Sequence, residues 1–249
     1  MMPVMIIFDV DRTLTRSKLP ANSEMVKALS ELLATKRVGI ISGDSLSILK
    51  RDIVSLLPVE SDFGNLFLLP TSGAALYVWK QEDWHEVYAE ILTGEDTSKI
   101  GGMIRSACEE TGLIDLSAPS YGERIEYRGA QVTLSALGQQ APIEEKEKWD
   151  PNGSKKRALR DAIARLLPEY DVKTGGSTSV DVTRHGVNKA YGIRRLSEHL
   201  SIPISEMLYV GDALYPEGND EVVGETGIAT RQVSGPDETL QIISEYSNG

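Results

Sequence analysis

Two aspartates spaced two residues apart follow an apolar run near the start of the printed sequence. The run is "VMIIF", residues 4–8, and it leads directly into Asp9, Val10 and Asp11. Side chains at positions i and i+2 of an extended chain point to the same side, so the two carboxylates share one space. Two clustered acids indicate a cation site or proton chemistry, provided that distant parts of the chain supply matching groups.

A second group of polar residues follows another apolar stretch, "VGIIS" at 38–42. The turn Ser42-Gly43-Asp44-Ser45 opens a predicted helix, whose N-terminal amides suit an anion. A third candidate, Lys189, begins the predicted helix 188–200. Taken singly, a serine or aspartate at such a place is typical of a turn or cap, and a lysine is typical of a solvated helix surface.

A third stretch follows the apolar residues "MLYVG" at 207–211 and contains Asp212, Asn219 and Asp220. In an open α/β sheet, ligands bind at the carboxyl ends of the strands, so acids from several strands gather at one edge. Three or four carboxylates there repel one another unless a cation lies among them. Mg²⁺ suits such oxygen ligands, because it takes one or two carboxylates together with water and a phosphate. The combination therefore predicts a Mg²⁺ and phosphate site.

The elements that must position these residues form an α/β pattern. In the first third of the chain, apolar runs of strand length alternate with helical spacing, giving strands at 4–10, 38–42 and 65–69 and helices at 22–35 and 45–57. Such alternation is typical of an open sheet with right-handed crossovers. Residues 74–79 and 84–89 then predict a hairpin.

The pattern changes in the middle of the chain. A predicted helix at 97–111 precedes the alternating stretch 123–137, which predicts an antiparallel hairpin turning at Arg128-Gly129. A helical stretch ending in 154–167 and two short strands follow.

From residue 187 the α/β pattern returns, with helices at 188–200 and 236–246 and strands at 207–211 and 227–231. The sequence thus predicts an α/β fold with a doubly wound, mostly parallel sheet as a catalytic core, residues 1–85 and 187–249. An inserted α+β cap domain, residues 86–186, interrupts this core.

The composition of the 249-residue chain excludes some functions. Its net charge of −11 and pI of about 4.9 argue against a nucleic-acid-binding module, which would show a basic stripe. No apolar run approaches the roughly 20 residues that span a bilayer, and the start "MMPVMIIFDV" lacks the features of a signal peptide. We therefore expect a cytoplasmic protein with no membrane or nucleic-acid partner. The single cysteine, Cys108, is expected in the core.

Four segments together resemble a known enzyme superfamily. "DVDRT", Ser42, Lys189 and "GD…ND" match in order the four motifs of the haloacid dehalogenase-like phosphotransferases. The inserted block lies between the second and third motifs, as in the subgroup with a large cap there. Within that subgroup the chain is most similar to the eukaryotic-type phosphomannomutases. The shared segments are "GERIEYRGAQVTLSALG", "GGSTSVDV" and "GDALYPEGND", and the likeness extends over nearly the whole chain.

The resemblance implies a role for each motif residue. Asp9 is the nucleophile that accepts the phosphoryl group, and Asp11 is the general acid/base, whose backbone carbonyl helps to bind Mg²⁺. Ser42, with the adjoining Gly43, and Lys189 hold the transferring phosphate. The implied metal ligands are Asp9, Asp11, Asp212, Asn219 and Asp220. Phosphoryl transfer depends chiefly on positioning and charge neutralisation, which these groups can provide.

The resemblance also implies substrate-binding residues in the cap. Arg128 matches a phosphate-binding position, and Ser179 and Asp181 match positions for the distal phosphate and the sugar hydroxyls. The alternative is that Ser179 and Asp181 only form the polar face of a strand. The expected partner is a small phosphorylated metabolite, in particular a sugar phosphate. A second copy of the chain, bound through the cap in a homodimer, is a further possible partner.

The chain departs from the family at four positions that belong to the expected substrate-binding set. Arg12 replaces the usual glycine; if that position requires a positive φ, Arg12 carries a strain of about 1 kcal/mol, and it adds a guanidinium at the mouth of the site. Lys18, Gln139 and Lys146 stand where the family has arginine. Lysine keeps the charge but loses the bidentate fork, and glutamine loses the charge. These changes weaken the grip on a bisphosphorylated intermediate.

The departures favour a Mg²⁺-dependent phosphatase of sugar phosphates or similar small metabolites. The alternative is a phosphomannomutase, which interconverts mannose 1-phosphate and mannose 6-phosphate through the same aspartyl-phosphate. A non-enzymatic sugar-phosphate sensor is a third hypothesis, but a sensor need not keep a nucleophile such as Asp9 together with its acid, Asp11. A Rossmann-type nucleotide-binding enzyme is disfavoured, because no G-x-G-x-x-G follows the first predicted strand.

Overall fold

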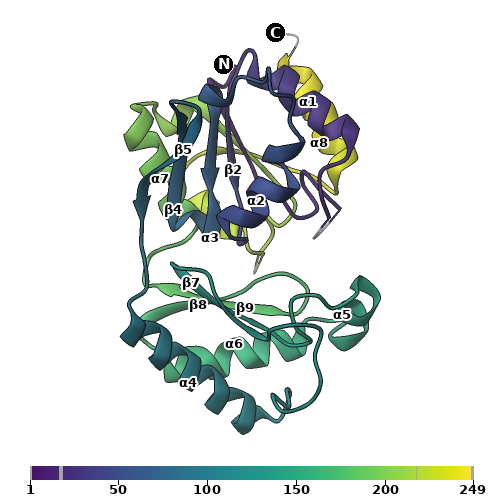
Figure 1. Ribbon diagram of the computed structural model, residues 1–249, viewed down its shortest axis with the longest axis vertical. Helices are drawn as coiled ribbons and strands as arrows, with labels where there is room; N and C mark the ends of the chain where they lie inside the picture. Colours follow the sequence, from purple (N-terminus) through teal and green to yellow (C-terminus); the bar gives the residue numbers. More distant parts are fainter. Residues whose placement is uncertain (1, 17–18, 217, 248–249) are drawn as a thin grey trace. The chain divides into compact units, whose positions relative to one another are not determined.

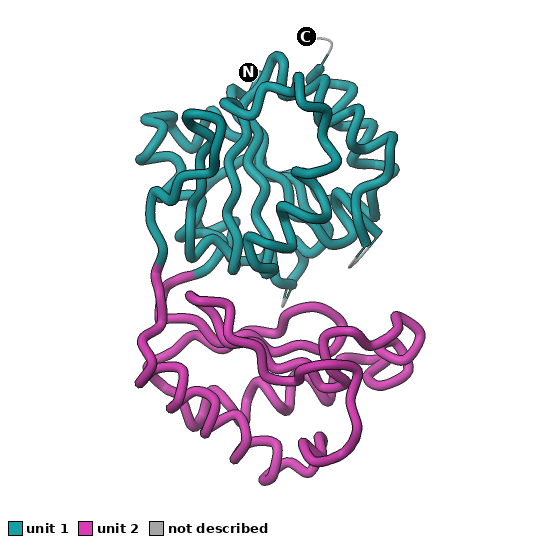
Figure 2. The backbone as a smooth tube through the Cα atoms, in the orientation of Figure 1, with its two compact units in different colours: residues 1–89, 188–249 teal, residues 90–187 magenta. Residues whose placement is uncertain are grey.

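A computed structural model describes residues 2–16, 19–216 and 218–247, and the chain divides into two compact units. Unit 1 comprises Met1–Ala89 and Asn188–Gly249, and unit 2 comprises Glu90–Val187 (Figure 2). Each unit has its own sheet and its own apolar core. That unit 1 is a catalytic core and unit 2 a substrate cap stays a prediction.

Unit 1 is built on a seven-stranded sheet with the order β11-β10-β1-β2-β3-β4-β5 (Figure 1). Neighbouring strands from β11 to β3 run parallel, and β4 and β5 are added antiparallel. This arrangement confirms the predicted α/β class with a mostly parallel sheet. The strands are β1 (Met5–Phe8), β2 (Arg37–Ile41), β3 (Leu66–Leu69), β4 (Ala75–Lys80), β5 (Asp83–Ala89), β10 (Met207–Gly211) and β11 (Ala229–Gln232).

Helices cover both faces of this sheet. Side chains alternate between the faces along each strand, so the apolar strands must bury side chains on both sides. Ile6 and Phe8 of β1 belong to the apolar core that includes α1, α2 and α8, and Ile7 belongs to the core that includes α7. In the central strands β1, β3 and β10, which are buried throughout, polar groups can be presented only beyond the strand ends. The α-helices of unit 1 are α1 (Ser23–Leu33), α2 (Leu46–Asp52), α3 (Pro70–Gly73), α7 (Lys189–Leu200) and α8 (Pro236–Ser247). Short 3₁₀ helices span Val54–Leu56, Phe63–Asn65, Ile204–Glu206 and Glu221–Thr226.

The parallel register brings separate chain segments to one edge of the sheet. Phe8 of β1 pairs with Val210 of β10 on one side and with Ile40 of β2 on the other. Asp9 therefore leaves the sheet between the ends of β10 and β2, each of which leads into another polar segment. The predicted gathering of polar groups at the carboxyl edge follows from this pairing.

Unit 2 contains an antiparallel sheet with the order β6-β7-β9-β8 (Figure 1). Val132 of β7 and Val180 of β9 lie in the apolar core with α4 and α6, and Cys108 of α4 is buried there as predicted. The hairpin of β6 and β7 turns at Arg128-Gly129, as predicted. The elements are α4 (Gly94–Thr111), β6 (Ile125–Tyr127), β7 (Gln131–Ser135), α5 (Ile143–Trp149), α6 (Ser154–Leu166), β8 (Tyr170–Thr174) and β9 (Ser179–Arg184).

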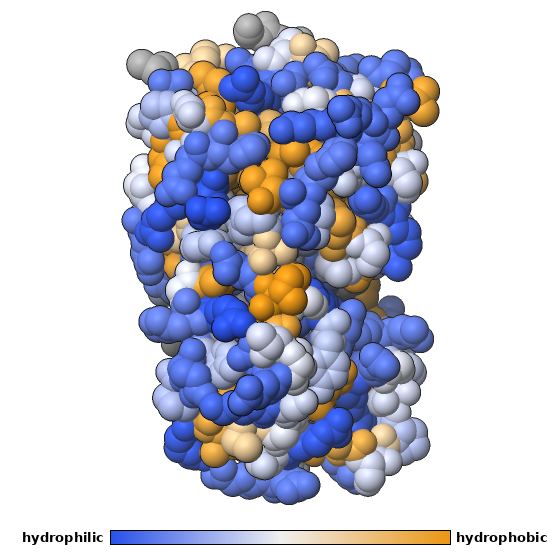
Figure 3. Space-filling view, turned by 60° about the vertical axis from the view of Figure 1, so that its left-hand side comes forward, coloured by the Kyte–Doolittle hydropathy of each residue, from blue (hydrophilic) through white to orange (hydrophobic). Residues whose placement is uncertain are grey.

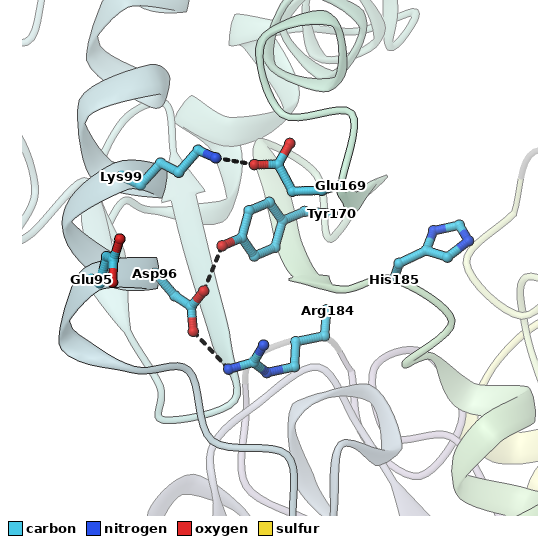
Figure 4. Close-up of a pocket in the computed structure, with 7 residues that line it drawn as sticks. All are labelled: Glu95, Asp96, Lys99, Glu169, Tyr170, Arg184 and His185. Atoms are coloured by element: carbon cyan, nitrogen blue, oxygen red, sulfur yellow. Dashed lines mark hydrogen bonds and ion pairs between the residues drawn. The ribbon is translucent and has the colours of Figure 1, made fainter.

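Helix α4 begins earlier than predicted, at Gly94, because Thr93 and Asp96 form a reciprocal capping box. The Asp96 carboxylate also accepts hydrogen bonds from the Tyr170 hydroxyl and from Arg184, each at 2.6 Å (Figure 4). The hydrogen bond from Tyr170, then those from Thr93, and last the charge of Arg184 lower the pKa of Asp96 to about 2. The capping residue of α4 thus also joins this helix to β8 and β9.

A polar pocket of about 500 Å³ adjoins this network in unit 2 (Figure 4). On its wall Lys99 pairs with Glu169, and Arg184 pairs with Asp96. These pairs of opposite charge neutralise each other. They join α4 to β9 and to the residue before β8.

The surface is largely hydrophilic on the face drawn in Figure 3, with apolar residues scattered between polar ones. Among the residues that the structure describes, every helix is too short or too polar to cross a bilayer.

Several residues other than glycine adopt a left-handed backbone. In the described ranges they are Arg12, Thr71, Ser72, Gln81, Glu82 and Ser201. Gln81 and Glu82 form the two-residue turn between β4 and β5, where two positive φ angles match the strand twist. Arg12 has a φ of 60°. The position therefore has the positive φ that glycine adopts more easily than arginine. The conformation costs an L-residue about 1–2 kcal/mol.

Glycine at either position should relieve this strain. We expect Glu82→Gly to raise the free energy of unfolding by about 0.5–1 kcal/mol, because glycine removes the steric clash but adds entropy to the unfolded chain. Arg12→Gly should gain a similar amount in about 0.5 M NaCl, which screens the loss of its charge. Urea denaturation measures the free energy of unfolding of both variants. Glu82→Ala is the control, since alanine keeps the Cβ atom; an equal gain with alanine would exclude backbone strain as the cause.

Candidate active site

Lys189 lies at the buried centre of the candidate site. It is the first residue of α7, and Asn188 caps that helix by accepting a hydrogen bond from the Tyr191 amide at 3.1 Å. The Lys189 ammonium donates to Asp9 Oδ1 and Asp220 Oδ1, each at 2.5 Å. Burial alone would lower the pKa of Lys189, but the carboxylates of Asp220 and Asp9 outweigh it and hold the pKa above its ordinary value. The side chain therefore stays charged, although the residue is only 3% exposed.

Asp220 holds Lys189 in place. Its Oδ1 also accepts a hydrogen bond from the Tyr209 hydroxyl at 2.7 Å, and its Oδ2 accepts one from the Ala213 amide at 3.3 Å. Burial, and then the charge of Asp220, raise the pKa of Tyr209 well above its ordinary value, so this hydroxyl remains a donor. A Cβ atom at Gly211 would lie 2.5 Å from Asp220 Oδ2, so glycine is required to leave room for the carboxylate. Both oxygens of Asp220 are thus engaged by the protein itself.

The Asp9 carboxylate uses only one of its two oxygens in hydrogen bonds among the described residues. Its amide donates to the Val210 carbonyl at 2.9 Å, which anchors it at the end of β1. Asp9 Oδ1 accepts from Lys189, whereas Oδ2 is buried and has no hydrogen-bond partner among the described residues. Burial raises the pKa of the Asp9 carboxyl to about 7, against the attraction of Lys189. A buried carboxylate oxygen left in this state favours a proton, a cation or a reacting partner.

Asp9 is one of three carboxylates that lie close together. Asp9, Asp212 and Asp220 can each present an oxygen within 4.8 Å of the others. Burial, and then repulsion by Asp220, raise the pKa of Asp212 to about 6. When all three carboxyls are ionised, the one ammonium of Lys189 leaves two negative charges uncompensated, so the ionised site has a deficit of positive charge.

This donor set fits a hard divalent cation, which prefers carboxylate oxygens. Asp9 and Asp212 are the residues that would hold it, because the oxygens of Asp220 already accept hydrogen bonds from Lys189, Tyr209 and Ala213.

The other predicted core residues lie around this centre. Asp11 is half-buried just beyond β1 and does not belong to the group of three carboxylates. Ser42 is buried at the end of β2, and its Oγ accepts from the Asp44 amide at 3.1 Å across Gly43. Asn219 is exposed in the loop that leads to the buried Asp220. The structure thus brings Asp9, Lys189 and the two later aspartates together most closely.

Two predicted substrate residues lie on the polar face of the unit 2 sheet. Asp181 of β9 accepts a hydrogen bond from the Thr133 hydroxyl of β7 at 2.7 Å. The Ser179 hydroxyl lies 3.3 Å from that of Ser135, again across β7 and β9. These cross-strand pairs form a row of hydroxyl and carboxylate groups opposite the apolar face.

The remaining predicted cap residues are placed differently. Arg128 is bonded to Glu126 Oε2 through Nε at 3.0 Å and Nη2 at 2.7 Å, and its side chain is 5% exposed. Lys146 Nζ approaches the Gln139 carbonyl at 3.4 Å, so these two are neighbours. The side-chain amide nitrogen of Gln139, Nε2, is buried without a hydrogen-bond partner in the part of the chain that the structure describes. Lys18 lies outside the described residues, and substrate binding by this set stays a prediction.

Sequence reasoning missed two residues of the site, Tyr209 and Gly211. Tyr209 lies inside the apolar stretch "MLYVG", where a tyrosine is the least apolar residue of a strand buried on both faces. A buried tyrosine hydroxyl usually finds a hydrogen-bond partner, and that was the available signal. The need for Gly211 arises because the loop after β10 folds back and places the Asp220 carboxylate beside it. No local sequence pattern indicates this.

Comparison with known proteins extends these observations. The family model described as eukaryotic phosphomannomutase matches residues 25–248. The phosphomannomutase of Saccharomyces cerevisiae is 27% identical over 251 residues, covering 98% of this chain and 94% of the relative. The phosphomannomutase of Spinacia oleracea is 24% identical over 252 residues, covering 97% and 95% respectively.

Solved structures share the fold. An IMP-bound, N-terminally truncated IMP-nucleotidase of Plasmodium falciparum has a TM-score of 0.70 at 16% identity, covering 100% of this chain and 69% of that chain. The trehalose-6-phosphate phosphatase of Aspergillus fumigatus has a TM-score of 0.55 at 17% identity, covering 98% and 92%. At these identities the likeness shows the fold alone. The family match, which spans nearly the whole chain and includes Ser42, Lys189 and Asp212, decides the assignment: the chain belongs to the eukaryotic phosphomannomutase family, among the haloacid dehalogenase-like phosphotransferases.

Proposed function

We propose that the protein is a Mg²⁺-dependent phosphotransferase that forms an aspartyl-phosphate on Asp9 and acts chiefly as a phosphatase of sugar phosphates. The observation that carries this proposal is the Asp9 carboxylate, with one oxygen held by Lys189 and the other without a hydrogen-bond partner among the described residues. A nucleophile must be fixed in position and still present an oxygen to phosphorus. Asp9 meets both requirements.

The reaction takes two steps in this proposal. An oxygen of Asp9 attacks the phosphorus of the ester, the bond from phosphorus to the ester oxygen breaks, and Asp11 gives its proton to the leaving oxygen. Asp11 then takes a proton from a water molecule, whose oxygen attacks phosphorus and releases inorganic phosphate from Asp9. The Ser42 hydroxyl and the Lys189 ammonium hold the phosphoryl oxygens in both steps.

Magnesium is the proposed cofactor, held by Asp9 and Asp212, with Asp11 and Asn219 near the same edge. When bound, a divalent cation neutralises charge so that an anionic nucleophile can approach an anionic phosphate. Lys189 cannot do this alone, because its ammonium is already shared between Asp9 and Asp220.

Water as the final acceptor is inferred from unit 2. A mutase must retain a bisphosphorylated intermediate by its non-reacting phosphate, which calls for fixed cations. Arg128 is already bonded to Glu126, and Gln139 is uncharged. Lys146 keeps a charge but lacks a bidentate fork. A weak hold on the far phosphate favours release of the sugar and hydrolysis of the acyl phosphate.

Phosphomannomutase activity is the second candidate. It is favoured by the names of the relatives that match nearly the whole chain. Ser179 and Asp181, proposed to bind the distal phosphate and sugar hydroxyls, would serve either reaction. The two candidates share Asp9 and Lys189 and differ only in the acceptor.

The nucleophile can be tested directly. Asp9→Asn should lower the rate of phosphate release from p-nitrophenyl phosphate at least 100-fold, a barrier increase of about 2.7 kcal/mol, because an amide cannot form the acyl phosphate. Phosphate release is measured under saturating Mg²⁺. Asp44→Asn, a change of the same size at another buried acid of this sheet edge, should retain much more activity. An Asp9→Asn protein with more than about a hundredth of the wild-type rate would contradict the covalent mechanism.

The metal can be tested by its effect on stability as well as on rate. EDTA should abolish activity, and Mg²⁺ should restore it and raise the thermal denaturation midpoint, because binding to the folded state alone stabilises it. Asp212→Asn should lose most of that Mg²⁺-induced rise. Asp237→Asn, which removes an exposed carboxylate of α8, is the matched control and should keep it. Full activity in EDTA, or an unchanged rise in Asp212→Asn, would contradict the proposed site.

The acceptor can be tested by measuring two products from one substrate. With mannose 1-phosphate we expect inorganic phosphate to form faster than mannose 6-phosphate, with or without a hexose 1,6-bisphosphate. Gln139→Arg should shift the ratio toward the mutase product, because it restores a cation at a buried, unpartnered amide. Gln140→Arg, at the exposed neighbouring position, should leave the ratio unchanged. If the wild type forms mannose 6-phosphate faster than it releases inorganic phosphate, phosphomannomutase activity replaces the phosphatase proposal.

A further inference from the structure

A short strained segment links the two groups proposed to hold the phosphate. Thr71, Ser72 and Gly73 are three consecutive residues with positive φ, at 50°, 59° and 83°. Thr71 is β-branched and buried, which makes a left-handed backbone especially unfavourable there. Such conformations cost about 1–3 kcal/mol each and persist only where the surroundings determine them.

The segment is bonded to the turn that carries Ser42. The Ser72 amide donates to the Ser42 carbonyl at 2.7 Å, and the Thr71 amide donates to the Asp44 carbonyl at 2.9 Å. The Asp44 amide in turn donates to Ser42 Oγ at 3.1 Å. Two consecutive amides of the segment therefore fix the backbone on both sides of Gly43, and with it the direction of the Ser42 hydroxyl.

The same segment touches the helix that carries Lys189. A Cβ atom on Gly73 would lie 2.9 Å from the Gly192 Cα atom, and one on Gly192 would lie 2.7 Å from the Gly73 Cα atom. The two backbones meet here only because both residues are glycine. Gly192 lies within the first turn of α7, where its amide donates to the Asn188 carbonyl at 3.0 Å. The start of α7 is therefore located against the segment.

Tyr88 secures the segment from β5. Its hydroxyl donates to the Gly73 carbonyl at 2.8 Å. Its ring packs edge-on against Tyr191 of α7, with 5.9 Å between the ring centroids and 90° between the planes. The Arg195 guanidinium lies 4.9 Å from the centroid of the Tyr88 ring. Tyr88 thus contacts both the strained segment and the helix of Lys189.

We propose that Tyr88 and the segment Thr71–Gly73 are positioning residues that hold Ser42 and Lys189 at the separation needed to grip the transferring phosphoryl group. The inference rests on the proposed function, because it assigns a purpose to the spacing of these two groups. It adds residues that touch neither the phosphate nor the nucleophile and act through Ser42 and Lys189.

The test is Tyr88→Phe, which removes only the hydroxyl bonded to Gly73 and keeps the ring. With p-nitrophenyl phosphate we expect kcat to fall about tenfold with little change in KM, since small misplacements of catalytic groups act mainly on the transition state. Orthovanadate, which mimics the phosphoryl group in transfer, should bind the Mg²⁺-loaded protein about tenfold more weakly in calorimetry. Tyr77→Phe is the matched control: it removes a hydroxyl of the same hairpin that bonds to Glu86 instead, and it should change neither quantity.

A double-mutant cycle separates positioning from general stability. Ser42→Ala should lower kcat, and adding Tyr88→Phe to it should cost clearly less than the tenfold seen in the wild type, because one of the two groups that Tyr88 positions is already lost. Independent, multiplying effects would overturn the inference, and so would a Tyr88→Phe protein that behaves like Tyr77→Phe. If the wild type hydrolyses no phosphate ester, the proposed function fails; weaker vanadate binding by Tyr88→Phe would then still support the positioning role, and unchanged binding would overturn it.

Discussion

The site depends on the burial of one ammonium group between two carboxylates. Moving such a charge out of water costs several kcal/mol, which Lys189 offsets chiefly through its bonds to Asp9 and Asp220. Removing one member of a buried pair costs about 3–5 kcal/mol, because the other charge stays buried and unpaired. The Asp9 carboxylate, the start of α7 and the loop after β10 are therefore fixed by the same interaction. This coupling explains how residues far apart in the sequence can act as one unit.

The close packing around this charge imposes requirements on residues that carry no functional group. Gly211 leaves room for Asp220, and Gly73 and Gly192 let two backbones meet beside α7. Tyr209 supplies a donor that a purely apolar strand could not offer. The polar centre is therefore supported by small residues and one hydroxyl, and the apolar cores on the two faces of the sheet hold these in turn.

Much of the fold could be predicted because its signals are local. Strands β1, β2, β3 and β10 are continuous apolar runs, as expected of parallel strands buried on both faces. Their order at one sheet edge made it possible to predict that Asp9, Ser42 and Asp212 would gather. The run of left-handed residues in "PTSG" could not be foreseen, because nothing local distinguishes it from an ordinary turn. Spacing alone also could not tell that Asp220 supports Lys189, since that depends on how the loop after β10 folds back.

The choice of acceptor is decided by smaller energies than those that fix the fold. A tenfold change in the partition between water and a sugar hydroxyl corresponds to about 1.4 kcal/mol, which is comparable to a single hydrogen bond to a charged group. In the proposed function, the loss of one charged group, as the family resemblance indicates at Gln139, is therefore of the size needed to change the main product. The fold, by contrast, depends on packed apolar cores and on the buried bonds of Lys189 to Asp9 and Asp220. In the proposed function, the outcome of the reaction instead depends on a few polar side chains of unit 2, where each lost charge alters the balance without disturbing the fold.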